Sequence, residues 1–212
     1  MQQGETVFIV DDDTSIGEGL KNLLESVGIK AEYFDSAEAF QKNWDHSRAG
    51  CLLLDARLPG MSGVELQEEL NAARIGIPVI FMTAHGDVPM VRKVLKAGAV
   101  EFLTKPFGME ELLSAINVAF DYDRLFRANA AIEQSIHARV NLLTDREREV
   151  LAMVTAGLLN KQIAARLNLS EITVKLHRRH VMDKMQAASL ADLVKMCERI
   201  KLESWKAAES AE

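Results

Sequence analysis

Short apolar runs alternate with longer amphipathic segments over the first 120 residues, and this alternation constrains the fold more than any other feature. Three of the runs are almost continuously apolar, as expected for strands that are buried on both faces of a parallel sheet. The runs are 6–10, 30–34, 51–54, 78–82 and 100–103, and the helical segments between and after them are roughly 15–27, 37–46, 63–73, 88–97 and 109–120. Five such strand–helix repeats predict an open, doubly wound α/β domain.

The strand pattern then stops, and only helical patterns follow. The segment 122–141 contains neither proline nor glycine and carries a thin apolar stripe, which predicts a linker helix; a loosely ordered connector is the alternative. Thr144 and Glu147 form a capping box that opens the next helix, and Asn160 is expected to cap a later one. We therefore expect a domain over 1–121, a helical linker over 122–141, a four-helix domain over 142–206 and a flexible tail over 207–212.

Charge is unevenly distributed over the 212 residues, whose formal net charge is −6. Residues 1–122 sum to −9 and residues 123–212 to +3, so an acidic half is joined to a basic half. No apolar run approaches the ~20 residues of a membrane-spanning helix, and the first residues lack the pattern of a signal peptide. Cys51 and Cys197 show neither metal-ligand spacing nor a disulfide framework. We expect a cytoplasmic protein without a membrane partner.

Acidic residues follow two strands that a doubly wound sheet places side by side. Asp11, Asp12 and Asp13 follow the first strand, and Asp55 ends the third. With a strand order of 2-1-3-4-5, Asp11, Asp12 and Asp55 would meet at the carboxyl ends of the strands, where such sheets bind ligands. Close carboxylates repel one another unless a hard divalent cation such as Mg²⁺ is present. Solvated loop charges are the alternative, and Asp13 is interpreted as a loop carboxylate or a helix-start charge.

Two further polar residues are expected at the same edge of the sheet. Thr83 follows the fourth run and Lys105 follows the fifth. Neither is needed to hold a metal ion, but an ammonium and a hydroxyl group can both bond the oxygens of a phosphoryl group. A carboxylate can accept a phosphoryl group covalently. The set therefore predicts Mg²⁺-assisted transfer of phosphate onto one carboxylate, with Asp55 as the central candidate.

These residues lie in segments with a recognisable pattern. The segments read Val10-Asp-Asp-Asp13, Leu54-Asp-Ala-Arg-Leu-Pro-Gly-Met-Ser-Gly63, Met82-Thr-Ala-His85 and Phe102-Leu-Thr-Lys-Pro-Phe107. Together they resemble the receiver domain of two-component response regulators, and the resemblance covers residues 5–121. It implies a flavodoxin-like (βα)5 fold.

The resemblance also implies roles for individual residues. Asp55 would be the phospho-acceptor, and Mg²⁺ would be bound by Asp11, Asp12, Asp55 and the backbone carbonyl of Arg57. The residues implied for phosphate sensing and switching are Thr83, Phe102 and Lys105, with Lys105 as the sensor; seen alone, Phe102 would be a core residue. Gly17 departs from the family, in which close relatives often carry a basic residue there.

A short helix, a turn and a longer helix over 171–185 predict helix-turn-helix geometry. When the longer helix is wound at ~100° per residue, three apolar residues fall on the core-facing arc: Val174, Val181 and Met185. Lys175, Leu176 and Arg179 fall on the opposite arc. Cations beside an apolar side chain suit a DNA major groove, where they can reach guanine, phosphate and the thymine methyl group.

This half carries a second recognisable pattern. The segments are Leu143-Thr-Asp-Arg-Glu-Arg-Glu-Val-Leu151, Gly157-Leu-Leu-Asn-Lys-Gln-Ile-Ala164 and Ser170-Glu-Ile-Thr-Val-Lys-Leu-His-Arg-Arg179. They resemble the LuxR-type DNA-binding domain, from about residue 142 to 200. The resemblance implies that Lys175, Leu176 and Arg179 face bases and that Asn160, Lys161, Thr173 and Arg178 face phosphates. For Asn160 and Thr173 a capping role is an equal alternative. His177 and His180 are interpreted as packing or solvent-facing residues, and Glu147 as structural.

The two resemblances together predict a phosphorylation-switched transcriptional regulator of the FixJ-like subgroup of the NarL/FixJ family, rather than a metabolic enzyme. The expected partners are a sensor histidine kinase, double-stranded promoter DNA and a second copy of the chain after phosphorylation; RNA polymerase is a further candidate. Activation of transcription is favoured over repression. Two alternatives stay open: a constitutive DNA-binding protein whose receiver is a docking module, and a phosphorelay protein that passes phosphate on.

Overall fold

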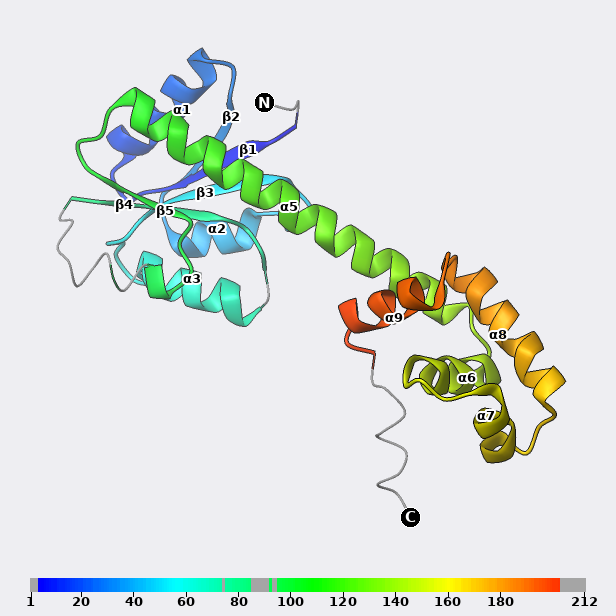
Figure 1. Ribbon diagram of the computed structural model, residues 1–212. Helices are drawn as coiled ribbons and strands as arrows, with labels where there is room; N and C mark the ends of the chain where they lie inside the picture. The colour runs from blue at the N-terminus through cyan, green and yellow to red at the C-terminus, as the bar shows by residue number, and fades with distance from the viewer. Residues whose placement is uncertain (1–3, 74, 85–91, 93–94, 203–212) are drawn as a thin grey trace. The chain divides into compact units, whose positions relative to one another are not determined.

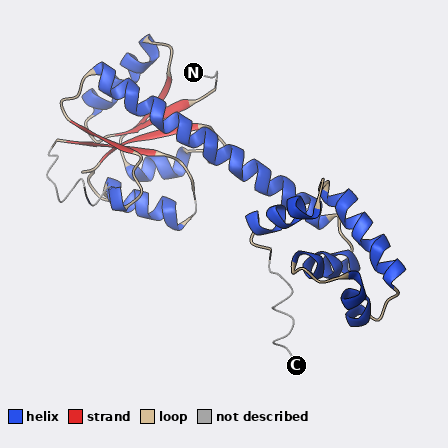
Figure 2. Ribbon diagram, viewed as in Figure 1, coloured by secondary structure: helices blue, strands red, loops and turns tan. Residues whose placement is uncertain are grey.

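The computed structural model describes residues 4–73, 75–84, 92 and 95–202 (Figure 1). The chain divides into two compact units, residues 1–127 and 128–212. The described part of the first unit is an α/β fold, and that of the second is helical, as Figure 2 shows. Both agree with the fold class predicted from the sequence. Within the described ranges, no helix combines the length and the apolar character needed to cross a lipid bilayer.

Parallel strands form the sheet of the first unit. The described strands are β1 (Thr6–Val10), β2 (Lys30–Phe34), β3 (Gly50–Asp55), β4 (Val79–Thr83) and β5 (Glu101–Thr104). Their order in the sheet is β2-β1-β3-β4-β5, which is the predicted order. In register, Val10 of β1 pairs with Leu54 of β3, so the residues that follow them lie side by side at one edge.

Helices cover both faces of this sheet (Figure 2). Those of the first unit are α1 (Thr14–Ser26), α2 (Ala37–Asn43), α3 (Gly63–Ala72) and the first part of α5 (Met109–Asn141). Leu24 of α1 and Ile116 of α5 pack with Ile9 in one core, and Phe40 of α2 packs with Phe8 in the other. Because β1, β3 and β4 are buried throughout, their nearly continuous apolar sequences are explained. The predicted helix 88–97 falls mostly outside the described residues.

Side-chain caps set the start of several helices. Ser36 is the N-cap residue of α2, and Ser62 is the N-cap residue of α3. Asp13 caps α1 by accepting the amides of Ser15 and Ile16, which agrees with a helix-start charge. The second helix ends at Asn43 rather than at residue 46. The backbone of Trp44 is extended, and its ring stacks on Phe40 with 5.0 Å between centroids, so packing ends the helix early.

Helix α5 is continuous from Met109 to Asn141, so the segment 122–141 that was predicted as a linker helix is helical throughout. A buried carboxylate holds its middle to the sheet. Asp123 is 1% exposed and accepts the Gly50 amide at 2.9 Å and the Arg127 Nε atom at 2.8 Å. Arg127 also donates to the Ser47 carbonyl at 3.0 Å and to the Arg48 carbonyl. These contacts fix the helix to the loop that precedes β3.

Short helices pack around one core in the second unit. They are α6 (Asp145–Thr155), α7 (Asn160–Leu167), α8 (Glu171–Met185) and α9 (Leu190–Arg199). The core includes Leu151, Ile163, Val174, Val181 and Leu193 from all four. The burial of Val174, Val181 and Met185 confirms the predicted core-facing arc. The capping box of Thr144 and Glu147 is also confirmed.

Two helix ends differ from the prediction. Asn160 is the first residue of α7 and not its cap, because Leu159 occupies the capping position and its amide donates to Gln162 Oε1 at 2.8 Å. The last helix ends at Arg199 rather than near residue 202, since Lys201 has a positive φ of 49°. A residue in the left-handed region cannot continue a right-handed helix.

Candidate functional site

Carboxylates converge at the carboxyl ends of β1 and β3. Asp11 and Asp12 follow β1, and Asp55 is the last residue of β3. One carboxylate oxygen from each lies within 4.8 Å of the others. Asp11 and Asp55 are buried and Asp12 is exposed, so solvent reaches the group at Asp12. The structure thus brings together the three side chains that the sequence pattern placed in one crevice.

Lys105 supplies a positive charge to this acidic pocket. Its Nζ atom donates to Asp11 Oδ2 at 2.6 Å and to Asp55 Oδ2 at 2.5 Å. Burial raises the pKa of Asp11, against the Lys105 hydrogen bond, which lowers it. Burial alone would lower the pKa of Lys105, but the bonds to the two carboxylates outweigh burial and raise it. The ammonium therefore stays charged, and one cation is shared by two buried carboxylates.

The other predicted residues of this site lie on the same edge. The Arg57 amide donates to Asp55 Oδ1 at 2.7 Å, which orders the loop after β3. Thr83 is the last residue of β4 and is buried. Phe102 is half-buried in β5, where it pairs in register with Phe81 and packs against the core. His85 and the residues up to 91 lie outside the described part of the chain.

The donor set of the pocket fits a hard divalent cation. It presents three carboxylates, of which two are buried and share one lysine. Mg²⁺ prefers one or two carboxylates together with waters and phosphate oxygens. The exposed side at Asp12 leaves room for water on the ion, so the arrangement can hold Mg²⁺ beside an arriving phosphoryl group.

Tyr33 is a residue of this site that the sequence did not reveal. Its hydroxyl donates to the backbone carbonyl of Asp11 at 3.0 Å. A Cβ atom at Gly17 would lie 2.1 Å from the Tyr33 ring, so the ring fills the space above this glycine. The departure at Gly17 therefore has a steric reason. The sequence did contain a signal for this contact: an aromatic residue, Tyr33, near the end of an edge strand and a glycine, Gly17, in the preceding helix.

The exposed face of α8 presents the three residues predicted to face bases. Lys175, Leu176 and Arg179 are all exposed, and Leu176 is 51% exposed despite its apolar side chain. Ile172, one turn before Leu176, is 80% exposed and was missed by the sequence reasoning. Its spacing of four residues from Leu176 was the signal. Two apolar side chains thus accompany two cations on this face.

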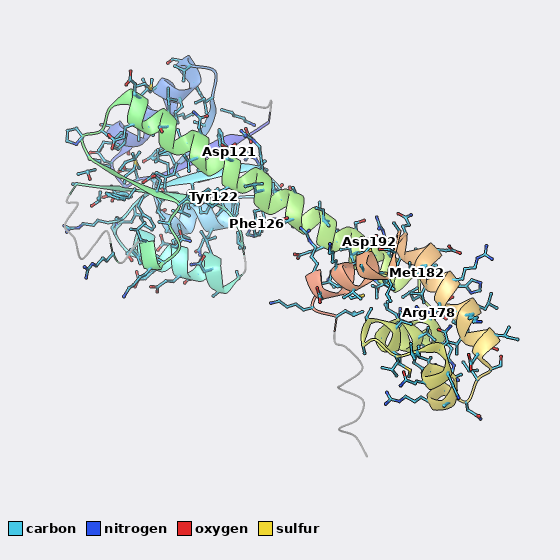
Figure 3. All side chains as sticks on the ribbon, in the orientation of Figure 1. Asp121, Tyr122, Phe126, Arg178, Met182 and Asp192 are labelled. Atoms are coloured by element: carbon cyan, nitrogen blue, oxygen red, sulfur yellow. The ribbon has the colours of Figure 1, made fainter. Side chains whose placement is uncertain are left out.

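The residues predicted to face phosphates are partly engaged within the domain. Arg178, labelled on α8 in Figure 3, donates to Asn160 Oδ1 at 2.9 Å and so joins α8 to α7. The Thr173 hydroxyl lies 2.8 Å from Ser170 Oγ, within the cap of α8. Lys161 is exposed in the first turn of α7. Because a guanidinium has five donors, Arg178 can hold Asn160 and still contact a phosphate.

Glu147 joins α6 to α8 as a buried carboxylate. It accepts the Thr144 amide at 2.8 Å and Lys184 Nζ at 2.6 Å. Burial alone would raise the pKa of Glu147, but the bonds from Lys184 and Thr144 outweigh it and lower the pKa to about 2. Glu147 is therefore ionised at neutral pH, and its contacts agree with the structural role expected from the sequence.

Comparisons with known proteins match both units. The family described as "Response regulator receiver domain" matches residues 7–117, and the family "Bacterial regulatory proteins, luxR family" matches residues 141–197. Receiver domains generally bind Mg²⁺ at an acidic pocket, and Asp11, Asp12 and Asp55 form an acidic cluster in this chain. A receiver domain implies a histidine kinase as partner, and a LuxR-type domain implies DNA binding.

Several relatives are similar over nearly the whole chain. "Response regulator protein TodT" of Pseudomonas putida is 44% identical over 199 residues, which cover 94% of this chain and 88% of TodT. "Nodulation protein W" of Bradyrhizobium diazoefficiens is 46% identical over 92% of this chain and 86% of that protein. "Transcriptional regulatory protein FixJ" of Rhizobium meliloti is 44% identical over 90% of this chain and 94% of FixJ.

Solved structures support the same assignment. A structure of the response regulator StyR, 47% identical, superposes with a TM-score of 0.78 and covers 92% of this chain and 99% of StyR. Full-length FixJ from B. japonicum is 37% identical with a TM-score of 0.56, over 96% of this chain and 100% of FixJ. The chain therefore belongs to the two-component response regulators that join a receiver domain to a LuxR-type DNA-binding domain, and it is a phosphorylation-dependent transcriptional regulator, not a metabolic enzyme.

Proposed function

We propose that Asp55 accepts a phosphoryl group from the phosphohistidine of a sensor kinase. A carboxylate oxygen of Asp55 forms the new O–P bond, and the P–N bond to the kinase imidazole breaks. Asp11, Asp12, Asp55 and the Arg57 carbonyl would hold Mg²⁺, which when bound neutralises charge on the transferred group. The observation that carries the proposal is that Lys105 lies within hydrogen-bonding distance of both Asp11 and Asp55.

The same residues would convert phosphorylation into a change of shape. Lys105 now bonds Asp55 Oδ2, and it would bond a phosphoryl oxygen once that carboxylate is phosphorylated. The hydroxyl of Thr83 would move toward another phosphoryl oxygen, and Phe102 would follow into the space that is released. This would remodel the surface that includes β5 and the start of α5, which we propose as the surface that dimerises; the predicted helix 88–97, expected in the same surface, lies mostly outside the described residues.

Dimerisation would bring two DNA-binding domains together. Lys175, Leu176 and Arg179 would face bases, and Asn160, Lys161, Thr173 and Arg178 would face phosphates. A single such domain resembles a non-specific binder, with Kd ~10⁻⁴–10⁻⁶ M, whereas regulators need roughly 10⁻⁸ M. Joining two of them supplies an effective concentration in about the mM range. We propose that the dimer binds a promoter site with two-fold symmetry and activates transcription through RNA polymerase. We also propose that the protein is cytoplasmic.

The domain boundaries are part of the proposal. We place the receiver at 1–121, the helical linker at 122–141 and the DNA-binding domain at 142–206, whereas the tail predicted at 207–212 lies outside the described residues. The change in composition at residue 121 and the capping box at Thr144 support these limits.

The test treats the full-length chain with a small phosphodonor and Mg²⁺, and follows its mass, oligomeric state and DNA affinity. Wild type should gain the mass of one phosphoryl group, form a dimer and bind a selected operator more tightly. Asp55→Asn should do none of these. Asp35→Asn is the matched control, because Asp35 is an exposed carboxylate of the same unit outside the pocket.

Two outcomes would contradict the proposal in different ways. An unchanged mass of the wild-type chain would refute Asp55 as acceptor. Phosphorylation without any gain in dimer or DNA affinity would instead favour a receiver that acts only as a docking module.

A further inference from the structure

A second group of potential metal ligands lies in the helical unit, outside the residues already given a role in phosphate or DNA binding. Glu147 is in the first turn of α6, and His177 and His180 are on α8. One carboxylate oxygen and one ring nitrogen from each histidine lie within 4.8 Å of one another. Residues three apart on a helix share a face, so the two imidazoles lie on the same side of α8.

Each imidazole of this cluster has an Nδ1 atom without a short hydrogen bond. The Nδ1 atom of His177 is buried and has no hydrogen-bond partner among the described residues. A buried polar atom without a partner is unfavourable and calls for a specific reason in a native structure. His180 Nδ1 lies 3.5 Å from Glu147 Oε1, which is long for a hydrogen bond. Both histidines therefore stand beside a carboxylate oxygen without a short bond to it.

Glu147 supplies the negative charge that a cation needs. Its Oε2 atom accepts the Thr144 amide and Lys184 Nζ, whereas the Oε1 atom faces His180. Lys184 opposes a second cation and limits its affinity, but it occupies the other oxygen. One carboxylate can therefore bridge an ammonium and a metal ion.

We propose that Glu147, His177 and His180 bind a divalent transition-metal ion of the Zn²⁺ class. Zinc is typically held by nitrogen and oxygen ligands at ~2.0–2.2 Å, and open sites combine three protein ligands with a water. Mg²⁺ prefers oxygen ligands, so the imidazoles favour zinc over the ion of the receiver pocket. The bound ion would join the first turn of α6 to α8, the helix that carries the exposed Lys175 and Arg179.

The test uses the full-length chain without an affinity tag, in excess Mg²⁺ so that the receiver carboxylates are occupied. Co²⁺ serves as the visible probe, followed by displacement with Zn²⁺. Wild type should bind one equivalent of Co²⁺ with the absorption of a four-coordinate site, and Zn²⁺ should abolish that band. His180→Asn should weaken Co²⁺ binding by about tenfold or more. His137→Asn is the matched control, because His137 is exposed on α5 outside the cluster.

A second measurement uses only the wild-type chain, so it does not depend on whether a substituted variant folds. In the NMR spectrum of the wild-type chain, added Zn²⁺ should shift the ring protons of His177 and His180 and leave those of His137 in place. The proposal is refuted if Co²⁺ binds wild type and His180→Asn equally, if no four-coordinate band appears, or if the rings of His177 and His180 do not respond to Zn²⁺.

Discussion

The acidic pocket of the receiver and the helical unit use buried charge in different ways. In the receiver, the buried Asp11 and Asp55 share one cation, Lys105, so negative charge is in excess. In the helical unit, the buried Glu147 is matched by Lys184 and by the Thr144 amide. The excess in the receiver is available for a metal ion and a phosphoryl group, whereas the matched pair holds two helices together. The residues proposed to contact DNA are mostly exposed, so the second unit separates its stability from its function.

The strongest test of this difference compares two substitutions that each remove one buried carboxylate. Glu147→Gln should lower the free energy of unfolding of the helical unit by about 3 kcal/mol, because Lys184 loses its charged partner. Asp55→Asn should change that of the receiver by less than about 1 kcal/mol, or stabilise it, since repulsion with Asp11 is relieved. Chemical denaturation in the absence of Mg²⁺ measures both.

Glu149→Gln is the control for the helical unit, because Glu149 forms an exposed ion pair with Arg146 on the same helix. It should cost well under about 1 kcal/mol. Equal losses from Glu147→Gln and Asp55→Asn would remove the distinction between matched and excess charge.

Acid should also act with opposite sign on two buried carboxylates, Glu147 of the helical unit and Asp11 of the receiver. The pKa of Glu147 is about 2 in the fold, below its ordinary 4.5, so its contribution is complete above pH 4.5 and is lost as the pH falls toward 2. That loss should reach about 3 kcal/mol. The pKa of Asp11 is raised, so protonation of this group favours the folded receiver as the pH falls.

The measurement is a pH series of denaturation in chelator, with separate probes for each unit. Glu147→Gln should remove most of the acid sensitivity of the helical unit between pH 4.5 and 2. An unchanged pH profile in that variant would show that other carboxylates cause the loss.

On the exposed face of α8, single substitutions should alter DNA binding and leave stability nearly unchanged. Lys175→Ala should reduce discrimination between operator and mismatched DNA by about 1–3 kcal/mol. Arg178→Ala should weaken binding to all sequences similarly and reduce the slope of log K against log salt by about 1. Titrations at several salt concentrations separate the two effects. Wild-type affinity and selectivity in both variants would contradict the assignment of this face.

The smallest expected effect concerns Tyr33. Tyr33→Phe keeps the ring over Gly17 but removes the hydroxyl that bonds the Asp11 carbonyl. Loss of one hydrogen bond is worth about 1 kcal/mol, so Mg²⁺ affinity of the receiver should fall by a factor of about five. Tyr122→Phe is the control, because Tyr122 is 57% exposed on α5 (Figure 3). Equal Mg²⁺ affinities in the two variants would show that Tyr33 does not position Asp11.

The sequence predicted the sheet order and the convergence of Asp11, Asp12 and Asp55 because both follow from regular repeats. Buried parallel strands have a distinctive apolar pattern, and their carboxyl ends meet at one edge. The capping box of Thr144 and Glu147 was equally visible, since it depends on residues three apart. These features are local in the chain or repeat along it.

Other features depend on contacts between residues far apart in the sequence. The buried Asp123 is matched by the Gly50 amide, 73 positions earlier, and nothing in its neighbourhood indicates burial. Asn160 looked like a helix cap because asparagine favours that position, yet the Gln162 side chain supports a start at Leu159 instead. The pairing of Glu147 with Lys184 likewise required the packing of α6 on α8.

Gly17 and Tyr33 also limit the order in which this receiver could evolve. Any side chain at position 17 would collide with the ring, beginning with a Cβ atom 2.1 Å away. A lineage that gains a larger residue there must also move or replace the Tyr33 ring, and a lineage that gains an aromatic residue at position 33 needs the space above residue 17. The two positions should therefore change together among descendants, with glycine at 17 accompanying an aromatic residue at 33.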